Sequence, residues 1–155
     1  MNRPSKGSCP SSSPLLEETI FVVLLKAADS LSQQVEQLFK SAGLTSAQYN
    51  VLRILRGAEP GGLPCSAVGE RMISHDPDMT RMLDRMEKRG WITRARETED
   101  RRVVRARITD EGLKVLRKLD QPVRELHKKR FAHMSPQRLK VLKELLEEIG
   151  HRESA

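Results

Sequence analysis

Ten arginine or lysine side chains lie between Arg81 and Arg107, against five aspartate or glutamate side chains, so this stretch carries +5 of the formal charge of +7 of the 155-residue chain. Such a stretch is suited to ionic and hydrogen-bonded contact with a polyanion, because guanidinium groups match phosphate oxygens in geometry as well as in charge. Charged surface helices usually mix signs more evenly, so the excess predicts a nucleic-acid interface. The alternative is a basic surface that only keeps the protein in solution.

Other chemically active side chains are few and scattered. No nucleophile–base pair, phosphate-binding loop or carboxylate pair stands out, so the sequence predicts no catalytic residue, no cofactor and no enzyme. A metal site is not expected either, because no ligand spacing relates Cys65 to any histidine, or the histidines to one another: His75, His127, His133 and His151.

The two cysteines, Cys9 and Cys65, occupy very different contexts. They make no disulfide framework, so a reducing cytoplasm is the expected location. Cys65 lies near an expected helix start, an environment that can lower the pKa of a thiol, but the sequence does not determine whether Cys65 or Cys9 senses redox state. No apolar run approaches the length of a membrane span, so no membrane partner is expected.

The basic stretch is predicted to form a helix, a glycine stop and a hairpin. Asp76 can cap the helix, and Pro77 suits its first position. Apolar residues then recur at three- and four-residue steps: Met79, Met82, Leu83 and Met86. Gly90 ends the helix. The period then drops to two, with apolar residues alternating with polar ones on both sides of a charged tip: Ile92, Val104, Ala106 and Ile108. A basic helix and a basic two-stranded ribbon suit a major groove and its neighbouring minor groove.

The elements before this stretch complete a helix-turn-helix. Thr45 and Gln48 have capping-box spacing at the start of a helix that ends at Gly57. Residues 63–65 are expected to form a minimal third strand, and a short helix follows with Val68, Met72 and Ile73 pointing inward. Two short helices, the second of them basic, with a hairpin as wing, make a winged helix-turn-helix.

Long amphipathic helices are expected on either side. The first runs from Leu16 to about Gly43. The second begins after Thr109, whose hydroxyl can cap it, and Pro122 is expected to kink or break it. Ser135 and Pro136 open a last helix that ends at Gly150. The first helix has more apolar surface than one small core can cover, which predicts pairing with a second subunit. Residues 1–14 are rich in Ser and Pro and are expected to be a disordered tail.

This order of elements resembles the MarR family of winged-helix regulators, over roughly residues 15–150. The most specific part is residues 80–112, TRMLDRMEKRGWITRARETEDRRVVRARITDEG. The family pattern there is T-R-x-x-D-x-L-E-x-x-G, a wing with an acidic tip and D-x-R, and then T-x-x-G. Met86 stands where Leu is usual, and the other positions match: Thr80, Arg81, Asp84, Glu87, Gly90, Asp100, Arg102, Thr109 and Gly112.

The resemblance implies a mainly α fold with a small β-hairpin wing. It implies one MarR-like domain, with a DNA-binding lobe at residues 44–112 and dimerisation helices at residues 15–43 and 113–150. By the resemblance, Arg102 enters the minor groove and Asp100 orients it. The complete set of expected DNA-binding residues is Asp78, Thr80, Arg81, Arg85, Arg94, Arg96, Asp100, Arg102 and Arg105. Within this set, Arg94, Arg96 and Arg105 are expected on phosphates.

The function implied is a homodimeric transcription regulator, a repressor, that binds a pseudo-palindromic double-stranded operator and is released by a small aromatic ligand. Two other classes stay open from the residues alone: a winged-helix module that binds an acidic protein, and a nonspecific architectural DNA binder. The sequence does not identify the operator, its genes, the effector or the role of the tail, and it leaves activation open as the alternative to repression.

Overall fold

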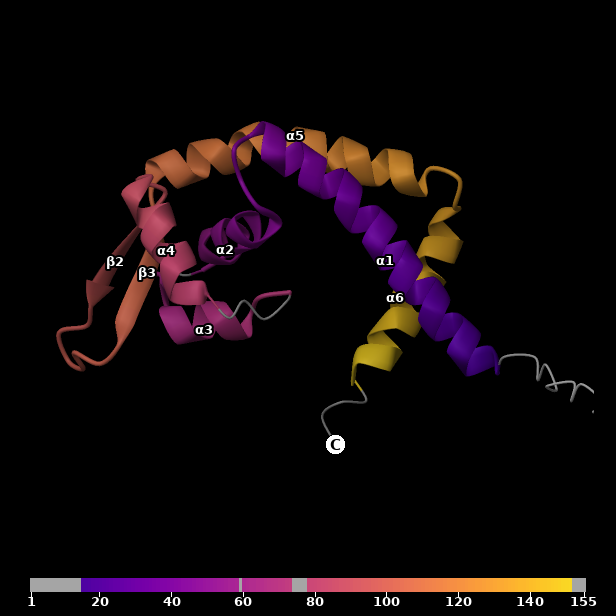
Figure 1. Ribbon diagram of the computed structural model, residues 1–155, viewed down its shortest axis with the longest axis horizontal. Coiled ribbons are helices and arrows are strands. Elements are labelled where there is room, and N and C mark those ends of the chain that lie inside the picture. The colour runs from indigo at the N-terminus through magenta and orange to yellow at the C-terminus, as the bar shows by residue number, and fades with distance from the viewer. Residues whose placement is uncertain (1–14, 59, 74–77, 152–155) are drawn as a thin grey trace, which may run out of the picture. The chain divides into compact units, whose positions relative to one another are not determined.

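A computed structural model of the chain describes residues 15–58, 60–73 and 78–151 (Figure 1). The chain divides into two compact units, Met1–Gln34 and Val35–Ala155. Helix α1, Leu16–Ser41, begins in the first unit and ends in the second. Among the described residues, no helix is both long and apolar enough to cross a membrane.

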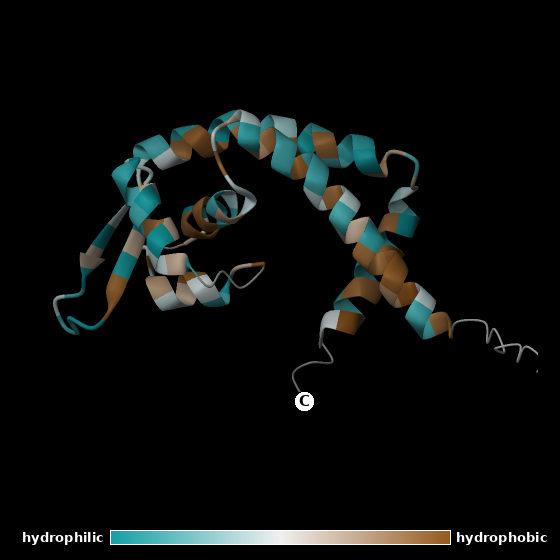
Figure 2. Ribbon diagram, viewed as in Figure 1, coloured by the Kyte–Doolittle hydropathy of each residue, from teal (hydrophilic) through white to brown (hydrophobic). Residues whose placement is uncertain are grey.

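The first unit consists, in its described part, of the N-terminal portion of α1, whose apolar side chains are largely exposed. Leu16 is 71% exposed, Phe21 63% and Val23 59%. Hydrophobic residues recur along this part of the helix (Figure 2), and no other described element of its own unit buries them. The helical prediction from Leu16 onward is confirmed, and the left-handed Gly43 (φ 72°) follows the helix end.

The second unit contains all the remaining elements. In chain order, α2 is Ser46–Arg56, β1 is Leu63–Pro64, α3 is Cys65–Glu70, α4 is Met79–Lys88, β2 is Ile92–Arg96, β3 is Val104–Ile108, α5 is Asp110–Phe131 and α6 is Pro136–His151. The three strands form an antiparallel sheet in the order β1-β3-β2. Its register places Leu63 and Arg94 on either side of Ala106. The predicted third strand exists, but Cys65 belongs to the helix that follows it.

One aliphatic core holds these elements together. It is built by α2, α3, α4, the sheet and the first half of α5, and its most deeply buried large side chains are Val51, Leu52, Val68, Met82, Leu83, Met86, Ile92 and Leu116. The predicted apolar face of α4 therefore points into the core, and the basic side chains of α4 remain outside. Phe39 and Tyr49 add a stacked aromatic pair, with ring centroids 4.1 Å apart.

Side-chain caps fix where two of the helices begin. At α2, the Thr45 hydroxyl accepts from the Gln48 N–H at 3.2 Å, and the Gln48 side chain accepts from the Thr45 N–H at 3.1 Å. This confirms the predicted capping box. At α5, the Thr109 hydroxyl accepts from the Gly112 N–H at 3.1 Å, as expected. Each cap satisfies donors that a helix start otherwise leaves unpaired.

One sequence prediction about an individual residue is wrong, and of the two effects expected of Pro122, a kink or a break, the break does not occur. Ile73 does not point inward but is 90% exposed, because α3 ends at Glu70 and helical spacing no longer applies beyond it. Its backbone N–H instead donates to Asn50 Oδ1 at 3.0 Å. Pro122 does not break α5, which continues from Asp110 to Phe131. The ring is exposed, so the helix accommodates it on the solvent side, where water can satisfy the freed carbonyl.

The start of the basic helix differs from the prediction. Helix α4 begins at Met79, and Asp78 occupies the capping position without a side-chain cap hydrogen bond. The residues proposed for the cap and the first turn, Asp76 and Pro77, lie outside the described residues. The predicted end is confirmed: Gly90 has φ 72°, its N–H donates to Glu87 at 2.8 Å, and the Trp91 N–H donates to Met86 at 3.1 Å. This pattern of two bonds is a Schellman motif.

Candidate nucleic-acid interface

The basic stretch forms one continuous structure, in which α4 packs against β2 and β2 pairs with β3 along its whole length (Figure 1). The tip between the strands is held by the backbone, because the Glu97 N–H donates to Val103 at 3.0 Å and the Val103 N–H to Asp100 at 3.0 Å. The stretch therefore has a helical part and a wing. The charged side chains of the helix and the wing fall into three groups according to their interaction partners within the chain.

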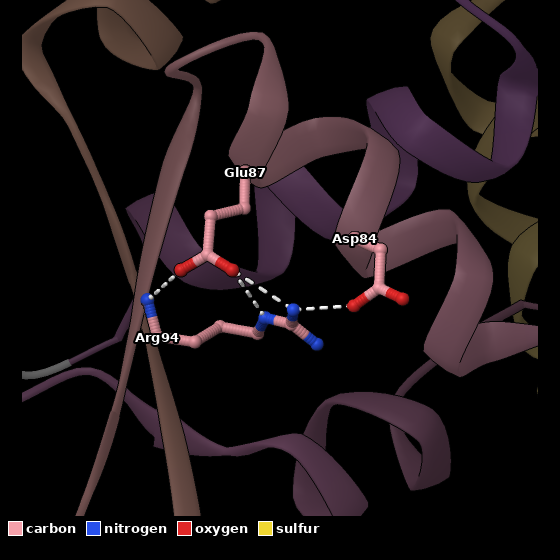
Figure 3. A network of polar contacts seen from close by, with 3 residues as sticks. All are labelled: Asp84, Glu87 and Arg94. Carbon is pink, nitrogen blue, oxygen red and sulfur yellow. Dashed lines mark hydrogen bonds and ion pairs between the residues drawn. The ribbon is translucent and has the colours of Figure 1, made fainter.

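The first group is turned inward, and its centre is Arg94. The Arg94 Nε donates to Glu87 Oε2 at 3.0 Å, and the Nη2 donates to the same oxygen at 2.8 Å and to Asp84 Oδ1 (Figure 3). The Arg94 backbone N–H also donates to Glu87 Oε1 at 2.8 Å. Only 20% of the Arg94 side chain is exposed. Two carboxylates on α4 thus hold an arginine on β2, which fixes the angle between the helix and the wing.

Electrostatics at this network favour a permanently charged guanidinium. Burial lowers the pKa of Arg94, but the hydrogen bonds that Arg94 donates to Glu87 and Asp84, together with their negative charge, raise it by more, so that the net shift is upward. The same burial acts on Cys65, which lies close enough to feel both Arg94 and Glu87. Burial raises the pKa of the Cys65 thiol above its ordinary range, and this outweighs the lowering by Arg94. The predicted lowering of the Cys65 pKa is therefore wrong, because α3 is short and its first residue is half-buried.

Three other arginines are also bound to the protein itself. Arg105 donates from Nε to Glu97 at 2.7 Å and from Nη1 to the Gly62 carbonyl at 2.9 Å. Arg107 donates to the Gly61 carbonyl at 2.8 Å. Arg89 donates to the Gly43 carbonyl at 2.7 Å. These hydrogen bonds join the turn before β1 and the end of α1 to the basic stretch. Arg105 therefore belongs with Arg94 in the inward group.

The second group brings together Asp78 and Arg81 at the start of α4. Arg81 Nε lies 3.6 Å from Asp78 Oδ1, and 80% of the Arg81 side chain is exposed. An aspartate beside an anionic polymer is repulsive on its own, so its value here is to hold the arginine in one direction. Thr80, the next residue along, is exposed.

The third group consists of exposed cations whose side chains form no ion pair or hydrogen bond with any other described residue: Arg85, Lys88, Arg96, Arg101 and Arg102. Sequence reasoning selected three of them and passed over Lys88 and Arg101. The signal that identifies Lys88 is its helical spacing from Arg81 and Arg85 on the outward face of α4. Arg101 adjoins Arg102 at the tip.

At the wing tip, Asp100 contacts the main chain of Arg102. Its Oδ1 accepts from the Arg102 backbone N–H at 2.9 Å, which is the local turn that aspartate side chains favour. The carboxylate was expected to orient the Arg102 side chain, and in the structure it fixes the backbone from which that side chain projects.

No group of three or more His, Cys, Asp or Glu residues lies in an arrangement suited to a metal ion within the described parts of the chain. His75 and Cys9 lie outside those parts. The arrangement on α4 and the wing instead offers an exposed, positive helix face and an exposed loop tip that carries two adjacent arginines, and partly buried ion pairs join the helix to the wing. A double helix presents two negative backbones that such a pair of elements can contact together.

Comparison with known proteins also indicates a DNA-binding protein. A model of the MarR family matches residues 44–104. The chain is 28% identical to the transcriptional repressor IacR of Pseudomonas putida, over 87% of this chain and 80% of that protein. Among solved structures, it is similar to a MarR transcription factor from Planctomyces limnophilus, with 35% identity, a TM-score of 0.67, and coverage of 88% of this chain and 98% of that one.

A second solved structure is the PcaV transcriptional regulator from Streptomyces coelicolor in complex with its natural ligand. The identity is 30%, the TM-score 0.68, and the coverage 83% of this chain and 92% of that one. With more than 30% identity over nearly the full length of a solved family member, and with the helix, wing and tip motifs in place, this chain belongs to the MarR family of winged helix-turn-helix transcription regulators.

Proposed function

We propose that this regulator binds a pseudo-palindromic operator in double-stranded DNA as a homodimer and represses transcription from it. The observation that carries the proposal is the set of exposed cations on α4 and the wing, which no acidic side chain of the described chain neutralises. If an acidic side chain of the protein were paired with each of these cations, little net positive charge would remain to attract phosphates. Because these cations are exposed, they favour the binding of an anionic partner such as DNA.

The residues divide the work of binding. We assign base reading in the major groove to Thr80, Arg81 and Arg85, on the outward side of α4 near its start, with Asp78 bracing Arg81. In helix-turn-helix proteins this end of the second helix points into the groove. We assign Arg102, supported by the Asp100 turn, to the minor groove, and Arg96, Arg101 and Lys88 to phosphates.

Arg94 and Arg105 receive a different role from the one first expected. Their donors already serve carboxylates and carbonyls of the same chain. A phosphate contact would require breaking those bonds. We therefore assign both residues to the positioning of the wing.

The homodimer is supported by the apolar surface of the long helices. In α6, Val141, Leu145 and Ile149 are each more than half exposed. Such surface is unfavourable in water by about 25 cal/mol per Å². Phe131, Leu139, Leu142 and Leu146, with Lys143 and Glu147, line a groove of about 390 Å³ beside α6. A second copy that covers these faces would place two α4 helices in successive major grooves, about 34 Å apart.

Two relatives support repression and its control. IacR is described as a repressor, and PcaV was solved with its natural ligand. We infer that this chain also represses, in the cytoplasm where the chromosome lies, and that a small aromatic ligand releases it. A ligand that changes the distance between the two reading helices prevents both from docking at once.

The proposal is tested by selection from a pool of random duplexes with the purified full chain. Enrichment of one inverted repeat is expected, with binding that weakens steeply with salt because counterions are released. Arg102→Ala should lower the salt slope by about one, as the loss of one backbone or groove contact requires. Binding without enrichment would identify an architectural protein, and no salt-dependent DNA binding would leave an acidic protein as the partner.

A further inference from the structure

Arg89 joins the ends of two helices. It is the residue directly after α4, and its Nη1 donates to the carbonyl of Gly43, just past the end of α1, at 2.7 Å. Its Cζ lies 4.7 Å from the centroid of the Trp91 ring, so the guanidinium is also stacked on an indole. Trp91 packs against the core, and its carbonyl accepts from the Thr109 N–H at 3.0 Å. One side chain therefore links the end of α1, the end of α4 and the start of the wing.

Both linked ends are closed by backbone hydrogen bonds and lie next to buried residues. After α1, the Leu44 N–H donates to Phe39 and the Gly43 N–H to Lys40, each at 3.0 Å, and Phe39 and Leu44 are only 2% exposed. After α4, the two Schellman bonds of Gly90 and Trp91 repeat the same construction. Since both helix ends contact the core, the Arg89 side chain fixes the end of α4 relative to the end of α1.

The bridge also suits the electrostatics of helix ends. The C-terminal end of a helix carries a partial negative charge from its unpaired carbonyls, and a cation there is favourable. Arg89 meets this condition at α4, which it follows, and at the Gly43 carbonyl, which follows α1. A planar guanidinium can stack on Trp91 and donate sideways to Gly43 at the same time, whereas an ammonium cannot do both with the same geometry.

We propose that Arg89 is a positioning residue for operator recognition, which sets the tilt of α4 by tying its end to the end of α1. This rests on the proposed function of α4 as the reading helix. Base-edge contacts require the helix at one angle, whereas phosphate contacts tolerate small changes. Loss of the bridge should therefore reduce the preference for the operator more than the affinity for DNA in general.

The experiment compares Arg89→Gln with Lys88→Gln. Both variants remove one positive charge from adjacent positions at the end of α4, but only the first removes the bridge. Operator and scrambled duplexes of equal length are titrated at one salt concentration, and thermal unfolding is recorded for each variant. Arg89→Gln should lower operator affinity about tenfold or more relative to Lys88→Gln, the size of effect expected when a base contact is misaligned. Lys88→Gln, which removes a proposed phosphate contact, should weaken binding to both duplexes by the same factor, whereas Arg89→Gln should weaken binding to the operator more than binding to the scrambled duplex.

The outcomes separate the possible roles of Arg89. Equal losses of operator affinity in the two variants would show that Arg89 supplies only charge. A loss in Arg89→Gln that is as large on the scrambled duplex as on the operator would show a phosphate contact, and either result overturns the proposal. If the wild-type chain itself does not discriminate between the duplexes, the proposed function has failed instead. Should Arg89→Gln fail to fold, Arg89→Lys against Lys88→Arg makes the same comparison at constant charge, and only the first should lose discrimination.

Discussion

Arginines that are close together in the sequence of this protein have opposite environments. Arg94 and Arg96 are two residues apart on β2, yet Arg94 is held by Glu87 and Asp84 and Arg96 is exposed without an ion pair among the described residues. The difference arises because the strand faces α4 at Arg94 and β2 ends at Arg96. Charge of the same kind is therefore paired within the chain at one position and left exposed at the other.

Replacing each of these two arginines by glutamine should separate the roles. Arg94→Gln leaves two carboxylates without their partner and should lower the free energy of unfolding by about 2 kcal/mol, the scale of a hydrogen bond to a charged group. Arg96→Gln should change the free energy of unfolding by less than about 0.5 kcal/mol. It should weaken binding to any duplex and reduce the salt slope by about one. Urea denaturation and salt titration check the two results, and similar behaviour of both variants would contradict the assignment.

Arg85 offers the sharpest distinction between base reading and phosphate contact. If it forms a bidentate contact with guanine, Arg85→Ala should weaken operator binding by about 1–3 kcal/mol and scarcely affect a scrambled duplex. Titration of both duplexes at one salt concentration measures this. Equal losses would move Arg85 to the phosphate contacts and leave Thr80 and Arg81 as the readers.

At the scale of elements, the junction between α4, the wing and α5 is unusually close. Thr109 donates from its hydroxyl to the Gly90 carbonyl at 2.6 Å, and a Cβ at Gly112 would lie 2.3 Å from the Trp91 carbonyl oxygen and 2.8 Å from Ile108 Cγ1. The glycine permits the first turn of α5 to pack directly on the backbone that follows α4. Helices α4 and α5 are therefore positioned by direct backbone contact at this junction.

Gly112→Ala is expected to destabilise the protein although alanine is the better helix former. The clash involves a backbone atom that cannot turn away, so a loss of about 2–3 kcal/mol is expected, as for an overpacked core. Gly69→Ala in α3 is the control, because the nearest atom to its Cβ would be Met79 Cε at 3.9 Å. That variant should be neutral or up to about 1 kcal/mol more stable. Thermal unfolding that ranks the two the other way would be inconsistent with this close packing.

The pair Arg56–Asp120 joins α2 to α5 and gives a pH dependence. Arg56 Nη1 lies 2.8 Å from Asp120 Oδ2, and the hydrogen bond from Arg56 lowers the pKa of Asp120. A carboxyl whose pKa is depressed on folding adds stability above its unfolded pKa of about 3.9, and this is lost as pH falls through the lower folded value. Asp120→Asn should therefore reduce stability by about 0.5–1 kcal/mol at neutral pH and by progressively less in acid.

Urea denaturation across this pH range measures the effect. Glu148→Gln, at an exposed glutamate without an ion pair among the described residues, serves as control. A difference between Asp120→Asn and wild type that persists undiminished in strong acid would show that packing, and not the ion pair, joins the two helices.

For the whole molecule, the apolar faces of the long helices are the feature that requires a partner. Leu145 is 54% exposed on α6, with Val141 and Ile149 one turn away on either side, and each of these is also more than half exposed. A transcription regulator that reads an inverted repeat needs two copies, and these faces are the apolar surface available for joining them.

Leu145→Glu should convert a dimer into monomers or aggregates, because a carboxylate buried in an apolar interface would have no partner. Lys140→Glu is the control, since it introduces the same side chain at a site where 79% of the lysine is exposed. Sedimentation at micromolar concentration distinguishes the species. A wild-type chain that sediments as a monomer would falsify the homodimer.

The sequence by itself determined the local structure. Helix α4, its stop at Gly90, the hairpin, the capping box at Thr45 and the cap at Thr109 follow from residues within a few positions of each other, so periodicity and spacing were sufficient to predict them. The family pattern from Thr80 to Gly112 depends on the same local spacing. Ile73 was misplaced because a helical repeat was extended past a short helix, whose end is set by packing rather than by a strong stop signal.

Only the tertiary structure decided what each charged side chain does. The partners of Arg94 are 7 and 10 residues away, and those of Arg105 and Arg107 include carbonyls 43 and 46 residues away. No sequence period relates these positions, so charge counting treated all ten cations alike. The same holds for Cys65, whose pKa is set by burial in the folded unit and not by its place at a helix start. Chain folding brings such distant groups together, and desolvation then determines which charges are neutralised internally and which remain for DNA.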